Sequence, residues 1–173
     1  MSKSMIDLCR RMCCVLALVA GAAGLPLAAE EDGLSVGRVE AVFVQEHRAQ
    51  ANTIKLEFAE AGLENVHLQF MKAGRPPTNV GMGPSVSVAR AQAALRLAKR
   101  YNGAVTILLP ERLFPAHYIA IASSSFDDTV EYQIDEATMK ELENPALTTE
   151  QFHELYRRLT PADHPPVKKG RVF

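Results

Sequence analysis

The sequence predicts a single α+β domain in which a mainly antiparallel sheet packs against one long amphipathic helix, with short C-terminal helices. Three observations support this prediction. The 173 residues are 47% hydrophobic and 23% charged, which is the composition of one globular domain and not of a disordered chain. One segment has a clear helical period. Several short segments rich in β-branched residues follow one another through links that are too short for crossover connections.

The helical segment, Ser85–Asn102, is the clearest element of the sequence. Small and apolar side chains share one broad side at about 100° per residue, namely Val88, Ala91, Ala94, Leu95, Ala98 and Tyr101. Polar and basic side chains share the opposite side, namely Gln92, Arg96, Lys99 and Arg100. We expect Ser85 to cap the N-terminus of this helix and Gly103 to follow its last residue.

Other segments are predicted to be strands from their β-branched residues or from alternating apolar and polar residues: 36–45, 53–59, 66–70, 104–109, 116–123 and 129–135. The segment 46–62 has two interpretations. Ile54, Leu56 and Phe58 alternate with polar residues as in a strand, which we favour, whereas Ala59–Leu63 is typical of a helix end. We expect 104–109 to be a central strand and the last three strands to form antiparallel hairpins.

Two short helices are predicted after the strands, at 136–143 and 149–159. Thr148 or Thr149 is expected to cap the second of them. Residues 160–173 are rich in proline and then basic, which predicts a loose tail.

The first 29 residues have the layout of a secretory signal peptide. Basic residues precede an apolar run at Met12–Gly24, and Leu27–Ala29 offers a cleavage site. We therefore expect residues 1–29 to be a signal peptide, residues 30–159 to form the domain, and the protein to be periplasmic or secreted. An uncleaved anchor or a buried N-terminal helix is the alternative. All three cysteines lie in the first 14 residues, so cleavage would leave no thiol for disulfides or catalysis.

Charge is unevenly distributed along the chain, although the net charge is only −1. No acidic residue lies between Glu64 and Glu111, whereas the region 127–154 holds nine acidic residues and one lysine. The two blocks either pair with each other or form solvated faces, or the basic block binds an anionic partner. Nucleic acid is the least favoured partner, because the basic helix face has no aromatic side chains for base stacking.

The junction between the Gly/Pro-rich loop and the helix is the candidate ligand site. Backbone N–H groups and a partial positive charge at a helix N-terminus bind anions, and small residues let a ligand approach them. The candidate residues are Arg75, Gly81, Gly83, Ser85, Ser87 and Arg90. The spacing does not match the Walker or the dinucleotide-binding motif, because Gly-Lys-Ser/Thr and a third glycine are missing. The alternative is a tight connection that needs Gly and Pro for backbone reasons alone.

The basic helix face formed by Arg96, Lys99 and Arg100 is a candidate surface for an envelope protein partner. The same face allows only a weak peripheral contact with a membrane, because the apolar side of the helix is mostly alanine and buries little area.

A serine hydrolase is the main enzymatic alternative. His117, Ser123–Ser125 and Asp127 supply the residue types of a catalytic triad. In one extended strand, however, His117 and Ser123 would lie about 20 Å apart, so a distant histidine would have to act as the base. No Gly-x-Ser-x-Gly motif is present.

No metal or cofactor is predicted, because the histidines are scattered without the spacing of metal ligands. His153 shares a helix face with Glu150 and Glu154, which is typical of a solvated surface.

The sequence thus favours an exported, non-enzymatic binding or accessory domain that recognises an anionic ligand or a partner at the Gly81–Arg90 junction. Two alternatives remain open. One is a small envelope hydrolase that uses Ser123–Ser125 and Asp127, and the other is an inhibitor or immunity-type protein that presents its acidic region 127–154 to a basic enzyme.

Overall fold

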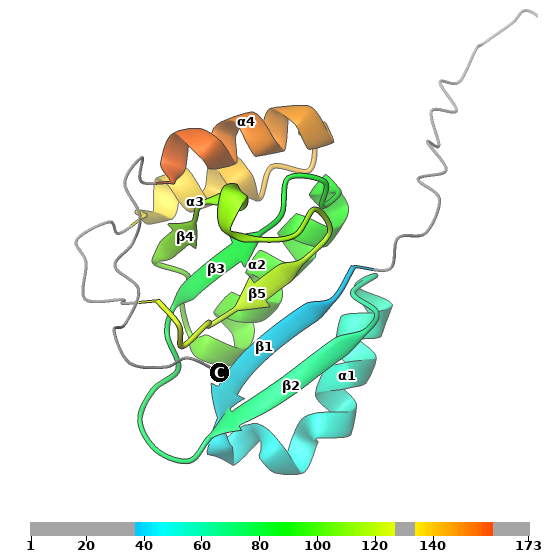
Figure 1. Ribbon diagram of the computed structural model, residues 1–173, viewed down its shortest axis with the longest axis vertical. Helices are drawn as coiled ribbons and strands as arrows, with labels where there is room; N and C mark the ends of the chain where they lie inside the picture. The colour runs from blue at the N-terminus through cyan, green and yellow to red at the C-terminus, as the bar shows by residue number, and fades with distance from the viewer. Residues whose placement is uncertain (1–36, 127–133, 161–173) are drawn as a thin grey trace, which may run out of the picture. The chain divides into compact units, whose positions relative to one another are not determined.

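The computed structural model describes residues 37–126 and 134–160, in which five strands form one mixed sheet (Figure 1). The strands are β1 (Val39–Val44), β2 (Val66–Met71), β3 (Asn79–Met82), β4 (Ile107–Leu109) and β5 (Ile119–Ile121). Their order in the sheet is β2-β1-β5-β3-β4. β1 pairs in parallel with both β2 and β5, and β3 pairs in parallel with β4. The pairing of β3 with β5 is antiparallel.

Helices lie between consecutive strands or follow the last strand. They are η1 (Gln45–Gln50), α1 (Ala51–Glu60), α2 (Val88–Asn102), η2 (Glu111–Leu113), α3 (Glu136–Leu142) and α4 (Thr149–Leu159), where η denotes a 3-10 helix. α1 and α2 lie behind the sheet in Figure 1, and α4 packs against both α2 and α3. The prediction of one domain that combines helices with a sheet is confirmed.

Alternation along β1 separates the two faces of the sheet. Val39, Ala41 and Phe43 are fully buried on the face that α1 and α2 cover. Glu40 and Val42 lie on the opposite face and are half-buried. In the described part of the chain, no α-helix covers this opposite face over β2, β1 and β5 (Figure 1).

The strand pairings correct the prediction of a mainly antiparallel sheet. β3 was not predicted, because its four residues belong to a segment rich in glycine and proline. It lies between β5 and β4, so the segments 104–109 and 116–123 do not form a hairpin, and β4 is an edge strand instead of a central one. Two of the parallel pairs are formed by strands that follow each other in the chain, and a helix connects the strands of each pair. α1 connects β1 to β2, and α2 connects β3 to β4.

The segment 46–62 is helical, and the strand predicted at 53–59 is wrong. Ile54 and Phe58 lie one helical turn apart and are fully buried together, whereas Leu56 between them is 65% exposed. The helix ends at Glu60, and Gly62, two residues beyond it, has φ of 74° and donates its N–H to the carbonyl of Ala59 at 2.9 Å. The glycine was therefore the better guide in this segment than the apolar alternation.

α2 confirms the predicted helix and its end, but not its cap. Gly103 follows the last residue with φ of 83° and donates its N–H to the carbonyl of Lys99. The helix begins at Val88 with Ser87 as the N-cap residue, so the prediction that Ser85 caps it is wrong. Gln92, expected on the solvated side, is buried because α3 packs there, and its amide donates to the carbonyls of Leu142 and Asn144.

Both C-terminal helices lie where the sequence predicts them. Thr148 caps α4 with a capping box, in which its side chain and that of Gln151 each accept a hydrogen bond from the other residue's backbone N–H. The signal peptide predicted at 1–29, most of the strand predicted at 129–135 and the tail beyond Thr160 lie outside the described residues.

The helical arrangement of α1 predicts opposite results for two neighbouring substitutions. We expect Phe58→Ala to lower the free energy of unfolding by about 3–5 kcal/mol, because it leaves a cavity in the core. Leu56→Ala is expected to change it by no more than about 0.5 kcal/mol. Urea unfolding of both variants measures the difference, and equal losses would contradict the helix.

Candidate functional site

The glycines of the candidate junction are packed against the chain that precedes β5. A Cβ atom on Gly81 would lie 2.2 Å from the ring of Phe114, and one on Gly83 would lie 1.8 Å from the carbonyl oxygen of Pro115. Gly83 and Ser85 also donate their N–H groups, at 2.9 Å, to carbonyl oxygens of the same segment. The close approach of an aromatic ring at Gly81 and of a backbone at Gly83 is itself a reason for glycine at both positions.

The N-terminus of α2 is partly occupied by α4. The N–H of Val88, the first residue of the helix, donates to Oγ1 of Thr149 at 3.2 Å. Ser87 has the extended backbone of an N-cap residue, but its side chain caps no N–H group. An anion at this helix end would therefore meet a donor that already has an acceptor.

Arg75 and Arg90 do not converge. The Arg90 guanidinium donates to the carbonyl of Gly37 at 3.1 Å, next to the start of β1. Burial lowers the pKa of Arg90, an effect that the nearby Glu64 carboxylate opposes. Arg75 is exposed in the loop after β2, at the end of the sheet where β1 also ends. Ligand binding by these residues together with Gly81–Ser87 stays a prediction.

The basic face of α2 is partly paired within the domain. Lys99 contacts Glu143 at 2.9 Å, and Arg100 contacts Glu57 at 3.2 Å. The first pair joins the basic block to the acidic region 127–154, as one interpretation of the charge pattern expects. Arg96 and Arg100 are both exposed, so charge on this face remains accessible to solvent. A protein partner at this face stays a prediction.

The serine run does not meet a histidine in the described residues. No hydrogen bond there joins a histidine nitrogen to a serine hydroxyl, and Nδ1 of His117 lies 3.0 Å from the carbonyl oxygen of Ser85. Asp127 of the hydrolase hypothesis lies outside the described residues. Within residues 37–126 and 134–160, no group of three metal-ligating side chains is present, and no helix is long and apolar enough to cross a membrane.

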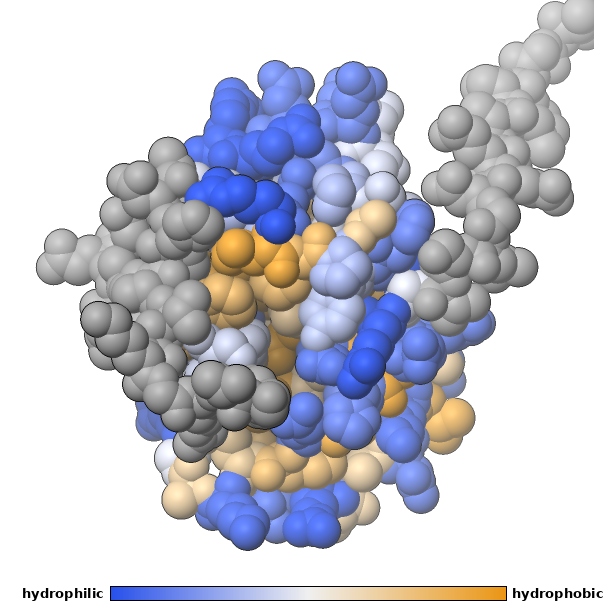
Figure 2. All heavy atoms as spheres, in the orientation of Figure 1, coloured by the Kyte–Doolittle hydropathy of each residue, from blue (hydrophilic) through white to orange (hydrophobic). Residues whose placement is uncertain are grey.

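A polar groove lies on the face of the sheet opposite α1 and α2. It has a volume of about 300 Å³, and Figure 2 shows it as a hollow in the molecular surface. Its lining comes from three strands and the turn after the last of them: Glu40, Val42, Gln69, Ala120, Ile121, Ser123, Ser124 and Ser125. Val42, Ala120 and Ile121 form the apolar part of the lining, and carboxylate, amide and hydroxyl groups form its polar part.

An unusual turn brings the serines to the groove. Ala122, directly after β5, is fully buried with φ of 58°, a conformation that non-glycine residues adopt only when the surroundings impose it. The buried side chain of Asn79 holds the next residue by accepting the N–H of Ser123 at 2.8 Å and donating to its carbonyl at 3.0 Å. β3 therefore fixes the position of Ser123–Ser125 beside β1.

The charge of Glu40 has partners within the domain. Its carboxylate contacts Arg38 at 2.6 Å. Tyr118 donates its hydroxyl to Glu40, and burial together with this hydrogen bond raises the pKa of Tyr118. The polar atoms that remain for a ligand are mainly the uncharged hydroxyls of the serines and the amide of Gln69.

Sequence reasoning missed Glu40 and Gln69. Glu40 could have been found from the sequence, because it is the polar residue of β1 and the alternation of the strand places it on the face opposite the core. Its neighbours follow only from the strand order, in which β1 lies between β2 and β5. No protein-family model, curated protein or solved structure matches the chain, so the candidate site rests on its geometry.

A buried polar cluster holds α4 in place. His153 is 4% exposed, and its Nδ1 lies 2.5 Å from Oε1 of Glu111 on η2. Its Nε2 lies 2.6 Å from the carbonyl oxygen of Val86 and therefore carries a proton, because a carbonyl only accepts. Arg157 approaches the second oxygen of Glu111 at 3.5 Å. The interpretation of His153 as part of a solvated helix face is wrong.

This cluster predicts a large effect for one substitution and a small effect for its neighbour. His153→Ala leaves the Glu111 carboxylate and a carbonyl buried without their partner, so we expect a loss of about 3–5 kcal/mol in unfolding free energy. Arg157→Ala removes a long contact from an exposed side chain and is expected to cost less than about 1 kcal/mol. Urea unfolding compares the two, and a small loss for His153→Ala would refute this role for the cluster.

Tyr101 predicts how stability depends on pH in alkaline solution. Burial and a hydrogen bond of 2.5 Å to Glu57 raise the pKa of Tyr101 to about 12. An unfolded chain ionises tyrosine near pH 10, so the stabilisation is complete below about pH 10 and is lost as pH rises towards 12. We expect Tyr101→Phe to unfold with a weaker pH dependence than the wild type over this range. Identical pH profiles in urea unfolding would contradict the expectation.

Proposed function

We propose that the protein is a non-enzymatic binding domain that holds an uncharged, hydroxyl-rich small molecule, such as a saccharide unit, in the groove over β1. The observation that carries the proposal is the lining of this groove, which combines three serine hydroxyls, one amide and one carboxylate with the apolar residues Val42, Ala120 and Ile121. A volume of about 300 Å³ is at the lower end of the range for small-molecule sites.

The chemistry of the lining supports a ligand with hydroxyl groups. A hydroxyl both donates and accepts hydrogen bonds, as do the serine side chains and the amide of Gln69. The carboxylate of Glu40 accepts only, and it is already bonded by Arg38 and Tyr118. A cationic ligand would have to compete with Arg38 for this carboxylate, so the lining favours an uncharged ligand.

The N-terminal sequence supports export, and the ligand would then be met in the periplasm or outside the cell. Anion binding at the Gly81–Arg90 junction has less support, because the contacts of Arg90 and of the Val88 N–H lie within the domain. Hydrolysis by Ser123–Ser125 has less support for the reason that no histidine is bonded to a serine hydroxyl in the described residues.

Substitutions of two exposed residues on the same strand test the proposal. Gln69 lines the groove, whereas His67, on the same face of β2, does not. With a panel of neutral mono- and disaccharides, we expect Gln69→Ala to weaken binding by about 2- to 12-fold, the effect of one lost hydrogen bond. His67→Ala is expected to bind as the wild type does. Isothermal titration calorimetry measures both affinities.

Ser124→Leu gives a second measurement, because a larger apolar side chain in the lining is expected to abolish binding. Inorganic phosphate serves as the anionic comparison. Saccharide binding that both groove variants leave unchanged, or no saccharide binding at all, would refute the proposal. Phosphate binding that Arg90→Ala removes would favour the junction instead.

A further inference from the structure

We propose that β2 pairs with β2 of a second copy of this chain, antiparallel and around a twofold axis that is perpendicular to the sheet and passes between the two copies of Leu68. The result is a dimer with one continuous sheet. This proposal is independent of the ligand in the groove.

The outer edge of β2 is open and unprotected. β2 is the last strand on one side of the sheet, and it pairs only with β1. Among the described residues, no hydrogen bond reaches the backbone groups on its outer edge. Soluble proteins protect such edges with charged residues, proline or very short strands. The six residues of β2, VHLQFM, contain none of these protections.

The opposite edge of the sheet is protected by a short strand and a proline. β4 has three residues and is followed directly by Pro110, which has no N–H to donate. Pairing of β2 with β4 of another copy would also give an open chain of molecules instead of a closed dimer. The two edges together therefore favour pairing of β2 with itself.

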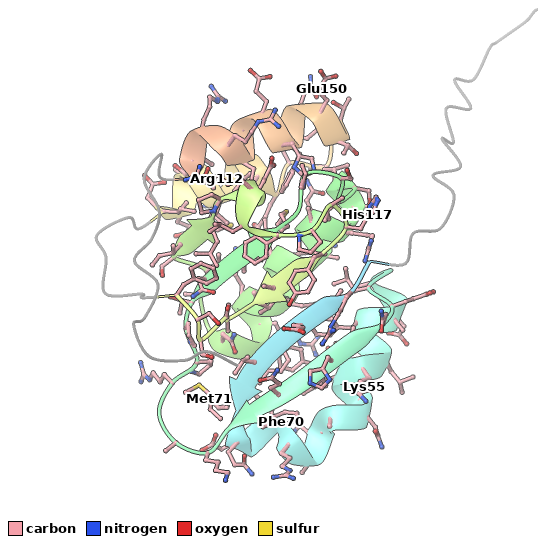
Figure 3. All side chains as sticks on the ribbon, viewed as in Figure 1. Lys55, Phe70, Met71, Arg112, His117 and Glu150 are labelled. Atoms are coloured by element: carbon pink, nitrogen blue, oxygen red, sulfur yellow. The ribbon has the colours of Figure 1, made fainter. Side chains whose placement is uncertain are left out.

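Apolar side chains at this edge are incompletely covered. Val66, Leu68 and Phe70 lie on the helix-covered face of β2 and are only half-buried, whereas Val39, Ala41 and Phe43, with which they are in register on β1, are fully buried. Figure 3 shows Phe70 and Met71 at the C-terminal end of β2. A second strand would cover the exposed part of these side chains.

Charge selects the antiparallel register. Glu64 lies four positions before Leu68, Lys72 lies four positions after it, and both are exposed. Antiparallel pairing about Leu68 brings Glu64 of one copy to the end of the strand where Lys72 of the other lies, twice in the dimer. It also places Val66 opposite Phe70 and His67 opposite Gln69, so that the helix-covered faces of both copies lie on the same side of the shared sheet. Parallel pairing in register would bring like charges together.

Light scattering of the full chain, as the host processes it and under reducing conditions, tests the association. We expect a mass of twice the monomer that falls on dilution. His67→Lys/Gln69→Lys places lysines opposite each other on both sides of the axis and is expected to give a monomer at every concentration. Both side chains are exposed, and an unchanged circular dichroism spectrum controls for folding.

Charge reversal tests the register. Glu64→Lys alone and Lys72→Glu alone each replace two attractions by repulsions, so we expect the dissociation constant to rise by about tenfold. An equimolar mixture of these two variants restores opposite charges at both ends and is expected to associate as the wild type does. Wild-type protein that is monomeric throughout, or dimers that all these variants leave unchanged, would overturn the proposal.

Discussion

The passage of the chain across β3 is the constraint on which the rest of the structure depends. Because β3 lies between β4 and β5, the segment that joins those two strands has to cross the face of β3. Gly81 and Gly83 have no side chains, and this lets the crossing segment lie directly on the strand. Two residues near the ends of the crossing segment form hydrogen bonds as a result. Tyr118 contacts Glu40 at the groove, and Glu111 contacts His153 of α4. One close backbone contact thus links the groove to the packing of the C-terminal helix.

The helices and the fold class follow from local signals, whereas the sheet order does not. Gly103 ends α2 and Thr148 caps α4 because each satisfies backbone groups within a few residues of itself, which is information that the local sequence contains. In α1, Ile54 and Phe58 fit a strand as well as one face of a helix, and the local signal that favoured the helix was Gly62 beyond its end. β3 owes its place to long-range pairing with β5, and its glycine-rich sequence carries no local strand signal.

The candidate site was less predictable than the fold for the same reason. The sequence shows the serine run, but its position depends on a buried contact with Asn79, which is 44 positions away in the chain. Glu40 and Gln69 become neighbours only through the parallel pairing of β1 and β2. Arg90, which stood out at a helix start without acidic residues, donates to the carbonyl of Gly37 and so contributes to the packing of the domain. Residue types indicated possible chemistry, and the tertiary contacts decided which of them meet.

The two halves of the sheet differ in how firmly they are held. On the β3–β4 side, the Tyr156 hydroxyl of α4 donates to the carbonyls of Val80 and Leu109, and its burial raises the pKa of that hydroxyl. The crossing segment covers the other face of β3, so backbone and side-chain groups on this side are largely used within the domain. On the β2–β1–β5 side, one face has no helix over it among the described residues, and the outer edge of β2 is open. The polar groups of this second half can still form hydrogen bonds, and both the proposed ligand groove and the proposed dimer contact use it. Pairing through β2 would leave the grooves of both copies on one side of a shared sheet.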